Sequence, residues 1–495
     1  MTSRTTADGR ADAARPDLPE DGAAAAPAVE RDSTLAPSGG IDAPVRLLSR
    51  EHLPVVVGIV ALVTLAAFEN RAVMTILPTV VRDLDGWGLF GASTGASLVT
   101  FTIAMAWSGG WTDRRGPRPA LLVGLGTFAL AQVVSGLAPT MGIFVAGRAI
   151  SGAAEALIDT ALFVLVAQAL PDALRAKVFA SFAAAWILPS LLGPSIAGGL
   201  DALAGWRVVF IAPLVVVPLA LIPIRTALRR THPGAGDAEE DVPGQRRRVT
   251  ASLVLAAGLA VTTFTAPWLE VPSTRLLGAV SIVAGLLVVV VGASRALPAG
   301  TFRLVRGVPA VIAMRMLVSA AFTGVGGVLP LMLVETHGAS TAVAGVSLTV
   351  TGVLWAFGSW GNSTGWAQAR PAADRLRVGG AFIALGSLGP VLLAVDLVGL
   401  VPGMAGWALA ATGMGIVSPT VSTELLAQAP AAEHGRVSAA QGLAVSTGVA
   451  FSTALAGAVV ALLGAAMTGP AFAALMGVGG LTALGVALAA GRTRP

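Results

Sequence analysis

Four charged side chains lie inside long apolar stretches of the sequence: Glu69, Arg148, Glu155 and Asp159. Placing a charge at the centre of a bilayer costs at least about 2.5 kcal/mol on insertion scales, so such residues usually bind protons, ions or substrates. At about 100° per residue of helix, Glu155 and Asp159 lie about 20° on either side of Arg148. These three side chains therefore share one helix face.

A cation flanked by two carboxylates suits a proton relay or an ion-pair relay. Burial raises the pKa of a carboxyl group and a nearby arginine lowers it, so a change in their separation can switch protonation. We expect Glu69 and Asp159 to be the proton or substrate carboxylates. A static ion pair between Arg148 and Glu155 is the structural alternative. Glu69, roughly 24 Å along its stretch, could instead reach interfacial water, with Arg71 as its partner.

Two further sets of residues could line a substrate pocket. Arg315 lies inside a later apolar stretch, where it could belong to a pocket or extend toward the membrane interface. Aromatic rings attract flat or cationic ligands, although positions in the packed core or facing lipid would also suit them. The candidates for an aromatic pocket wall are Trp107, Trp186, Trp355 and Phe357.

Motifs for covalent, metal or nucleotide chemistry are missing from the sequence. A glycine-rich loop that cradles phosphate groups needs a lysine followed by serine or threonine, and Lys177 is the only lysine of the chain. No His-Glu-x-x-His motif occurs, and there are no cysteines to act as nucleophiles or metal ligands. We therefore predict a protein that is not an enzyme and that uses neither a cofactor nor a metal.

The charged residues lie in apolar stretches of about 20 residues, the length that a helix needs to cross a bilayer core of about 30 Å. Hydrophobic residues make up 55% of the chain and charged residues only 12%, which excludes a soluble globular fold. We predict an all-α polytopic membrane protein with about fourteen transmembrane helices. They are expected near residues 53–78, 88–111, 119–138, 142–168, 177–200, 206–225, 251–269, 276–294, 306–334, 341–363, 376–397, 402–428, 436–464 and 469–490.

These helices are expected to form two bundles of six with two extra helices between them. Residues 1–45 are rich in Ala, Pro, Asp, Glu and Gly without an apolar period, which predicts a disordered cytoplasmic tail. The remaining expected divisions are an N-terminal bundle at 46–225, a cytoplasmic loop at 226–250, two additional transmembrane helices at 251–294 and a C-terminal bundle at 306–491.

Basic residues alternate between the two sides of this predicted topology. Basic residues accumulate in cytoplasmic loops, and with the N-terminus inside, only Arg82, Arg207 and Arg275 fall in outer loops. If the number of predicted helices were wrong by one, every later loop would be assigned to the opposite side of the membrane. The alternation of basic residues between the two sides would then be lost. The sequence therefore predicts a plasma-membrane protein with both termini in the cytoplasm. Because the arginines lie in short loops, we expect the lipid bilayer and no nucleic acid as a partner.

The loop after the second predicted helix carries a motif, Gly109-Gly110-Trp111-Thr112-Asp113-Arg114-Arg115-Gly116-Pro117-Arg118. It resembles the signature loop of the major facilitator superfamily, with Pro117 in place of one basic residue. Glycine's φ freedom permits a tight turn between helices, and the charged side chains could pair between helices. The resemblance implies a conformational latch formed by Gly109, Asp113, Arg114, Gly116 and Arg118.

Three other segments are similar to the fourteen-span drug:proton antiporter branch of this family. Arg148 to Gly152 resembles an Arg-x-x-Gln-Gly motif, with Ser151 where Gln is usual. The stretch around Gly193, Pro194 and Gly198 resembles the glycine-proline element of these antiporters and implies a hinge, although Pro189 replaces a glycine of the fuller motif. Residues 68–84 resemble their first helix, with Glu69 where Asp is commoner.

The resemblance implies a secondary active transporter that exports small amphipathic compounds or drugs in exchange for protons. Substrate would bind midway between the two bundles, and the latch would hold the outward-facing state. We expect a monomer. The alternatives are export of a lipid or secreted metabolite, proton-coupled uptake by symport, and a membrane sensor or scaffold that transports nothing.

Overall fold

The computed structural model describes residues 49–50, 52–86, 89–232, 242–269, 271–339, 341–463 and 467–494. All regular structure in these ranges is helical, and none of their residues forms a strand. The predicted disordered tail at 1–45 lies outside the described residues, as does the segment 233–241. The helices belong to one compact unit that spans Val45–Pro495.

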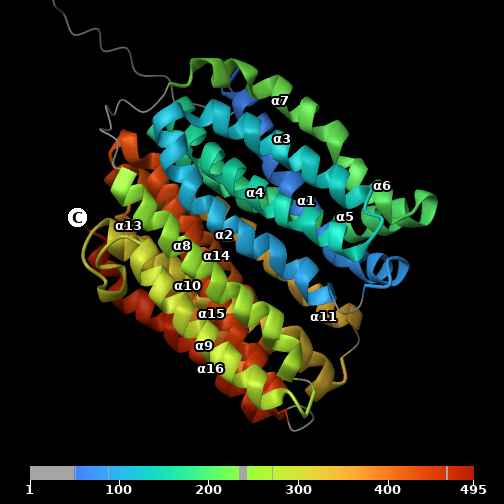
Figure 1. The fold of residues 1–495 in the computed structure, drawn as a ribbon. Helices are drawn as coiled ribbons and strands as arrows, with labels where there is room; N and C mark the ends of the chain where they lie inside the picture. The colour runs from blue at the N-terminus through green and yellow to red at the C-terminus, as the bar shows by residue number, and fades with distance from the viewer. Residues whose placement is uncertain are drawn as a thin grey trace, which may run out of the picture. The chain divides into compact units, whose positions relative to one another are not determined.

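Seven α-helices form the first half of the chain (Figure 1). They are α1 (Leu53–Asp83), α2 (Phe90–Arg115), α3 (Pro117–Gly136), α4 (Met141–Ala169), α5 (Asp172–Ala204), α6 (Trp206–Ile211) and α7 (Pro213–Arg230). Helices α6 and α7 follow each other so closely that Trp206–Arg230 is long and apolar enough to act as one membrane span. Because proline lacks a backbone N–H, Pro213 is well placed at the start of α7, where that group would have no helical partner.

The second half of the chain is also built from α-helices. Its α-helices are α8 (Val242–Thr265), α9 (Arg275–Ala296), α10 (Val308–His337), α11 (Thr341–Asn362), α12 (Gly365–Gln368), α13 (Ala372–Ala394), α14 (Leu400–Gln428), α15 (His434–Leu463) and α16 (Gly469–Ala489). Short 3-10 segments η2 (Ala266–Leu269), η3 (Thr301–Arg303), η4 (Ala431–Glu433) and η6 (Ala490–Thr493) connect or end them. Helices α7 and α8 extend into both ends of the loop predicted at 226–250.

Eleven helices of the described part of the chain are long and apolar enough to cross a membrane. Helix α5 adds a twelfth when its two segments, which meet at a bend of 42°, are counted as one span. Helices α2 and α11 lie at two further predicted positions. The predicted fold class, an all-α polytopic membrane protein, is confirmed.

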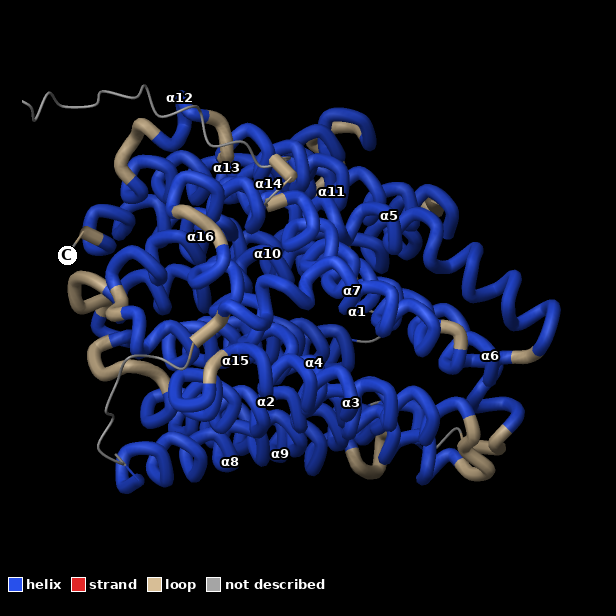
Figure 2. Tube along the Cα trace, turned by 90° about the horizontal axis from the view of Figure 1, so that it is seen from above, coloured by secondary structure: helices blue, strands red, loops and turns tan. Residues whose placement is uncertain are grey.

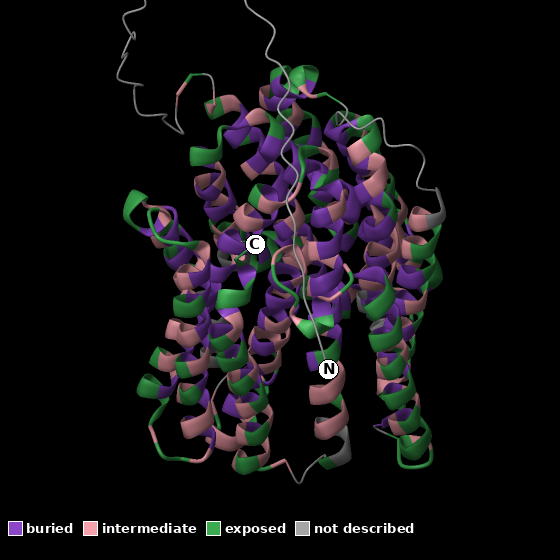
Figure 3. Cartoon of the chain, turned by 90° about the vertical axis from the view of Figure 1, so that its left-hand side faces the viewer, coloured by how far each residue is buried: buried purple, intermediate pink, exposed green. Residues whose placement is uncertain are grey.

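Large apolar side chains cover the outer faces of the helices, while buried residues lie between them (Figure 3). Leu276 of α9 is 79% exposed and Leu481 of α16 is 70% exposed. In water this surface would favour aggregation, but hydrocarbon chains solvate it without penalty, and the helices satisfy their own backbone hydrogen bonds. The outer surface is therefore suited to lipid.

The two halves of the chain meet at two seams. Helix α2 packs against α15, and α5 packs against α11. Helices α8 and α9 pack against each other and lie beside the first seam, α8 against α2 and α9 against α15 (Figures 1 and 2). A Cβ atom on Gly258 would lie 2.7 Å from the carbonyl oxygen of Gly285. Small residues thus let the backbones of α8 and α9 approach closely, as is common between membrane helices.

Candidate functional site

Helices α1 and α4 bring Glu69 and Arg148 together in the interior. The Glu69 carboxylate accepts a hydrogen bond from Arg148 Nη1 and forms an ion pair with it. Only 5% of the Glu69 side chain and 6% of the Arg148 side chain are exposed. Ser151 Oγ donates a second hydrogen bond to Glu69 Oε1 at 3.2 Å. Because a buried charge is costly unless it is paired, Arg148 and Ser151 together stabilise the Glu69 carboxylate.

This pairing differs from both pairings considered from the sequence. Arg148 pairs with Glu69 on a neighbouring helix, and the contacts of the described residues include no ion pair between Arg148 and Glu155. Arg71 does not pair with Glu69, and its guanidinium instead lies 6.0 Å from the ring centre of Trp186. Arg148 and Glu155 are separated along the axis of their own helix, α4. The Glu69 side chain instead reaches Arg148 across the gap between α1 and α4.

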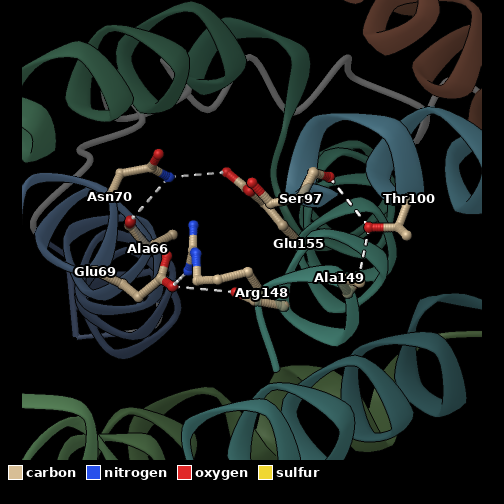
Figure 4. A network of polar contacts seen from close by, with 9 residues as sticks. Ala66, Glu69, Asn70, Ser97, Thr100, Arg148, Ala149 and Glu155 are labelled. Atoms are coloured by element: carbon tan, nitrogen blue, oxygen red, sulfur yellow. Dashed lines mark hydrogen bonds and ion pairs between the residues drawn. The ribbon is translucent and has the colours of Figure 1, made fainter. Parts of the chain in front are cut away.

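Asn70 links the next residue of α1 to the same face of α4. Its Nδ2 donates to Glu155 Oε1 at 3.4 Å and lies 3.5 Å from the Ala66 carbonyl oxygen. Figure 4 shows Glu69 and Asn70 on α1 directed toward Arg148 and Glu155 on α4. The sequence analysis did not identify Asn70. An amide directly after a carboxylate within an apolar stretch was the signal that could have found it.

A pocket between α1, α3 and α4 brings three predicted carboxylates together. Its cavity volume is about 20 Å³. One water needs about 10–15 Å³ by this measure, so water can enter. Asp159 is exposed to solvent, Glu155 is half-buried and Glu69 is buried. The pocket is lined by Leu62, Leu65, Ala66, Glu69, Leu125, Phe128, Ser151, Glu155, Ile158 and Asp159.

This pocket lies within the first six-helix half, not midway between the halves as expected for the substrate. It contains none of the four predicted aromatic residues, and its ring comes from Phe128. Trp107 is 42% exposed and stacks on Trp111, and Phe357 is 59% exposed beside Trp360. Trp355 contacts Phe322 edge to face with 5.4 Å between ring centres, and Trp186 faces Arg71. The aromatic side chains are thus dispersed over α2, α5 and α11.

Close glycine contacts set the rotation of α4 that points Arg148 and Ser151 toward α1. A Cβ atom on Gly147 would overlap Ser135 of α3, and one on Gly152 would overlap the Ser97 carbonyl oxygen of α2. Thr100 Oγ1 donates to the Ala149 carbonyl oxygen at 2.6 Å, which adds a hydrogen bond between α2 and α4. The face of α4 that packs against α2 and α3 is therefore fixed, and its polar face remains toward α1.

A bulky side chain at Gly152 is expected to destabilise the protein. Gly152→Leu would force α2 and α4 apart at the Ser97 carbonyl, and overpacking of this kind costs at least about 2 kcal/mol. Thermal unfolding of the purified variant, followed by tryptophan fluorescence, should occur at a lower temperature. Gly198→Leu is the matched control, because no atom lies within 4 Å of a Cβ at that glycine. Equal melting temperatures for the two variants would contradict the packing role of Gly152.

The predicted hinge residues lie just after the bend in α5. The segments Asp172–Pro189 and Leu192–Ala204 meet at 42°. Pro194 lies inside the helix, where its missing N–H removes a backbone hydrogen bond and its ring crowds the preceding turn. A Cβ on Gly193 would lie 3.3 Å from the Arg71 Cβ atom, whereas Gly198 has open space around it.

The signature loop contacts the beginning of α15. Asp113 accepts hydrogen bonds from the backbone N–H groups of Gly435 at 2.5 Å and Arg436 at 2.9 Å. These N–H groups belong to the first turn of α15, which has no intrahelical partners for them and carries the positive end of the helix dipole. A Cβ on Gly109 would lie 2.7 Å from the Gly435 carbonyl oxygen, so glycine is needed for this approach. We call the end of the helices where Asp113 meets α15 the latch end.

The other residues of the signature loop have separate contacts. Arg114 Nη1 donates to Gln245 Oε1 of α8 at 2.5 Å, so the loop also contacts the additional helices. Gly116 has φ of +82° in the turn between α2 and α3, a conformation that favours glycine. Arg118 is exposed. Gln245 was not a predicted site residue, because a polar side chain at the start of α8 carries no signal of its partner.

Arg315 does not join the cluster at α1 and α4. It lies on α10, where its Nη1 donates to Ser418 Oγ of α14 at 2.7 Å. Its side chain is half-buried, and its Nε atom is buried without a hydrogen-bond partner. The predicted site residues therefore fall into separate groups, namely the pocket between α1, α3 and α4, the latch end, the bend in α5, and Arg315.

Comparisons with known proteins identify relatives of this chain. A probable multidrug-efflux transporter of Mycobacterium tuberculosis is 31% identical over 231 residues, which cover 46% of this chain and 49% of that protein. The methylenomycin A resistance protein of Bacillus subtilis is 29% identical over 262 residues, 51% of this chain and 54% of that protein. The chain thus spans about half the length of these curated relatives.

Solved structures show the same fold at low sequence identity. The human organic anion transporter MFSD10 superposes with a TM-score of 0.61 at 16% identity, over 87% of this chain and 99% of that one. The proton:xylose symporter XylE gives a TM-score of 0.62 at 15% identity, over 88% and 94%. The sequence profile of the Major Facilitator Superfamily matches residues 59–453. Most of the chain matches, and the chain therefore belongs to the Major Facilitator Superfamily.

Proposed function

We propose that this protein couples the export of small amphipathic compounds to the inward movement of protons. The cluster at α1 and α4 carries the proposal, because Glu69, Glu155 and Asp159 all line a pocket that water can enter. Within the described residues, Arg148 is the only cation that hydrogen-bonds to one of these carboxylates. Membership of the superfamily makes the protein a membrane transporter and not an enzyme.

In a cluster with more carboxylates than cations, a proton that binds neutralises a carboxylate that has no cationic partner. The cluster can therefore take up and release protons while its net buried charge stays small. In the proposed cycle, movement of α1 relative to α4 breaks the pair between Glu69 and Arg148. A proton taken up by Glu69 then compensates for the lost positive charge. Re-formation of the pair releases the proton, and Glu155 and Asp159 exchange it with water in the pocket.

The same movement would open and close the two ends of the transporter in turn. The contact between Asp113 and the start of α15 would latch one end, and we assign this state as outward-facing. The bend in α5 beside Gly193 and Pro194 would act as the hinge, since a broken helix next to the second seam can change its angle without unfolding. The relatives named as a multidrug-efflux transporter and a drug-resistance protein support export over uptake.

The remaining parts of the proposal concern the cellular setting. Tryptophan and arginine positions suit insertion into a plasma membrane with both termini in the cytoplasm. We propose that a monomer suffices for transport, because the pocket is built from α1, α3 and α4 of one chain. Export of a lipid or metabolite, uptake by symport and a non-transporting role are the competing outcomes of the following experiment.

Transport in reconstituted vesicles tests the proposal. Purified protein is placed in liposomes with an internal pH-sensitive dye, and ethidium, a neutral drug or a set of metabolites is added outside under an imposed proton gradient. We expect ethidium movement with opposite proton movement, both in proportion to the amount of protein. Movement of protons and compound in the same direction would establish symport and contradict antiport. Compound movement that is independent of the gradient would contradict proton coupling.

A further inference from the structure

The two six-helix halves place polar contacts at equivalent junctions. Glu69 and Arg148 join α1 and α4, the first and fourth long helices of the first half. Arg315 and Ser418 join α10 and α14, the first and fourth long helices of the second half, at 2.7 Å. In the first half the arginine meets a carboxylate, whereas in the second half it meets a serine hydroxyl. The second junction thus contains an arginine but no carboxylate among the described residues, and this arginine lies on the first helix of its half, whereas Arg148 lies on the fourth.

The guanidinium of Arg315 lacks a counter-ion in the described part of the chain. No carboxylate there forms an ion pair with it, and its buried Nε has no hydrogen-bond partner. Ser319 lies one turn further along α10, and its buried Oγ is also without a partner. Removing part of a cation from water is unfavourable unless another group supplies negative charge. The described residues supply no such group to Arg315.

The neighbouring side chains are neutral and can donate hydrogen bonds. Ser418 accepts from Arg315, which leaves its own O–H free to donate. One turn further along α14, Ser422 donates to Gln441 Oε1 of α15 at 3.2 Å. The Ser422 proton is thus already engaged, whereas the hydroxyl groups of Ser418 and Ser319 can still donate. An arginine fork is suited to a planar carboxylate, which can accept two parallel N–H bonds.

Arg315 lies near the latch end of α10. It is roughly 10 Å along α10 from Val308, and Asp159 is roughly 15 Å along α4 from its end at Ala169. Helix α10 begins at the latch end, because the Gly307 N–H donates to the Arg492 carbonyl and Gln428, at the end of α14, donates to the Thr493 carbonyl. Arg315 of the second half and Asp159 of the first half are therefore both found toward the latch end of their helices.

We propose that Arg315, with Ser319 and Ser418, binds the carboxylate of a transported compound. This site would include organic anions and zwitterions among the small amphipathic compounds that are transported. The inference rests on the proposed function for its transported compound, but binding to the site can be measured without transport.

A pair of dyes that differ only in one carboxylate tests the site. A rhodamine with a free carboxylate and its methyl ester are titrated against purified protein in detergent, and fluorescence anisotropy gives the Kd of each. We expect the free carboxylate to bind at least about tenfold tighter, as for other hydrogen bonds to a charged group. Arg315→Gln should abolish this preference while leaving the Kd of the ester unchanged, and Arg315→Lys should restore part of it.

Arg306→Gln is the matched control, since it removes an exposed arginine shortly before α10 and should preserve the preference. Unchanged melting temperatures show that the variants are folded. Equal binding of both dyes by the wild type, or a preference that survives Arg315→Gln, would overturn the site. An equal loss of affinity for both dyes would also overturn it, because it would show a structural role. Carboxylate-dependent binding without proton-driven transport would instead contradict the proposed function alone.

Discussion

Glu69→Gln is expected to lower proton-driven transport at least about 100-fold, the scale of effect when a positioned proton-transfer group is removed. Glutamine preserves the shape of the side chain but can neither bind nor release a proton. In the structure the Glu69 carboxylate is buried and holds Arg148 and Ser151. The measurement is the rate of ethidium uptake into proteoliposomes under a proton gradient, together with its pH dependence.

A second variant separates loss of coupling from loss of fold. Glu69→Gln leaves the Arg148 charge buried without its partner, which costs about 3–5 kcal/mol. The double variant Glu69→Gln with Arg148→Gln removes both charges and should recover thermal stability without recovering coupling. Glu69→Asp retains a titratable group and should keep part of the activity. An unchanged pH dependence of transport in Glu69→Gln would remove Glu69 from the coupling mechanism.

Asp113→Asn is expected to shift the conformational equilibrium away from the latched state by about tenfold. A carboxylate at the beginning of a helix is stabilised by the helix dipole, typically by up to about 2 kcal/mol. The asparagine side chain of the variant would have no charge, and its NH₂ group would face the backbone N–H of Gly435 or Arg436. The chain has no cysteine, so spin labels can be attached at Arg115→Cys and Ala431→Cys. Pulsed electron resonance then gives the distance distribution across the latch.

The matched control is Asp374→Asn, which removes a carboxylate that pairs within its own helix turn with Arg377 at 2.8 Å. It should leave the distance distribution unchanged, whereas Asp113→Asn should increase the population at longer distance and lower the transport rate. An unchanged distribution in Asp113→Asn would contradict the latch. An equally large change of the distance distribution in Asp374→Asn would show that the effect comes from the net charge at this surface and not from the latch contact of Asp113.

Several site residues could be predicted from the sequence because their signal is local. A charged residue inside an apolar stretch needs a partner or water wherever the helix lies, which identified Glu69, Arg148, Glu155 and Asp159. The turn at Gly116 follows from a glycine between two helical segments. Gln245 carries no such signal, since it is an ordinary polar side chain until the signature loop lies beside it.

The helical membrane fold can be predicted from the amino-acid sequence alone, because the length and spacing of apolar stretches reflect the thickness of the bilayer and the need to satisfy every backbone hydrogen bond within it. Which charges meet depends on how the helices pack. Glu69 pairs with Arg148 across two helices, Asp113 meets the start of α15, and Arg315 meets Ser418 without a carboxylate from the described residues. These partners depend on helix rotation and on close glycine contacts such as that at Gly152. Such contacts involve residues far apart in sequence, so no local pattern of residue types specifies them.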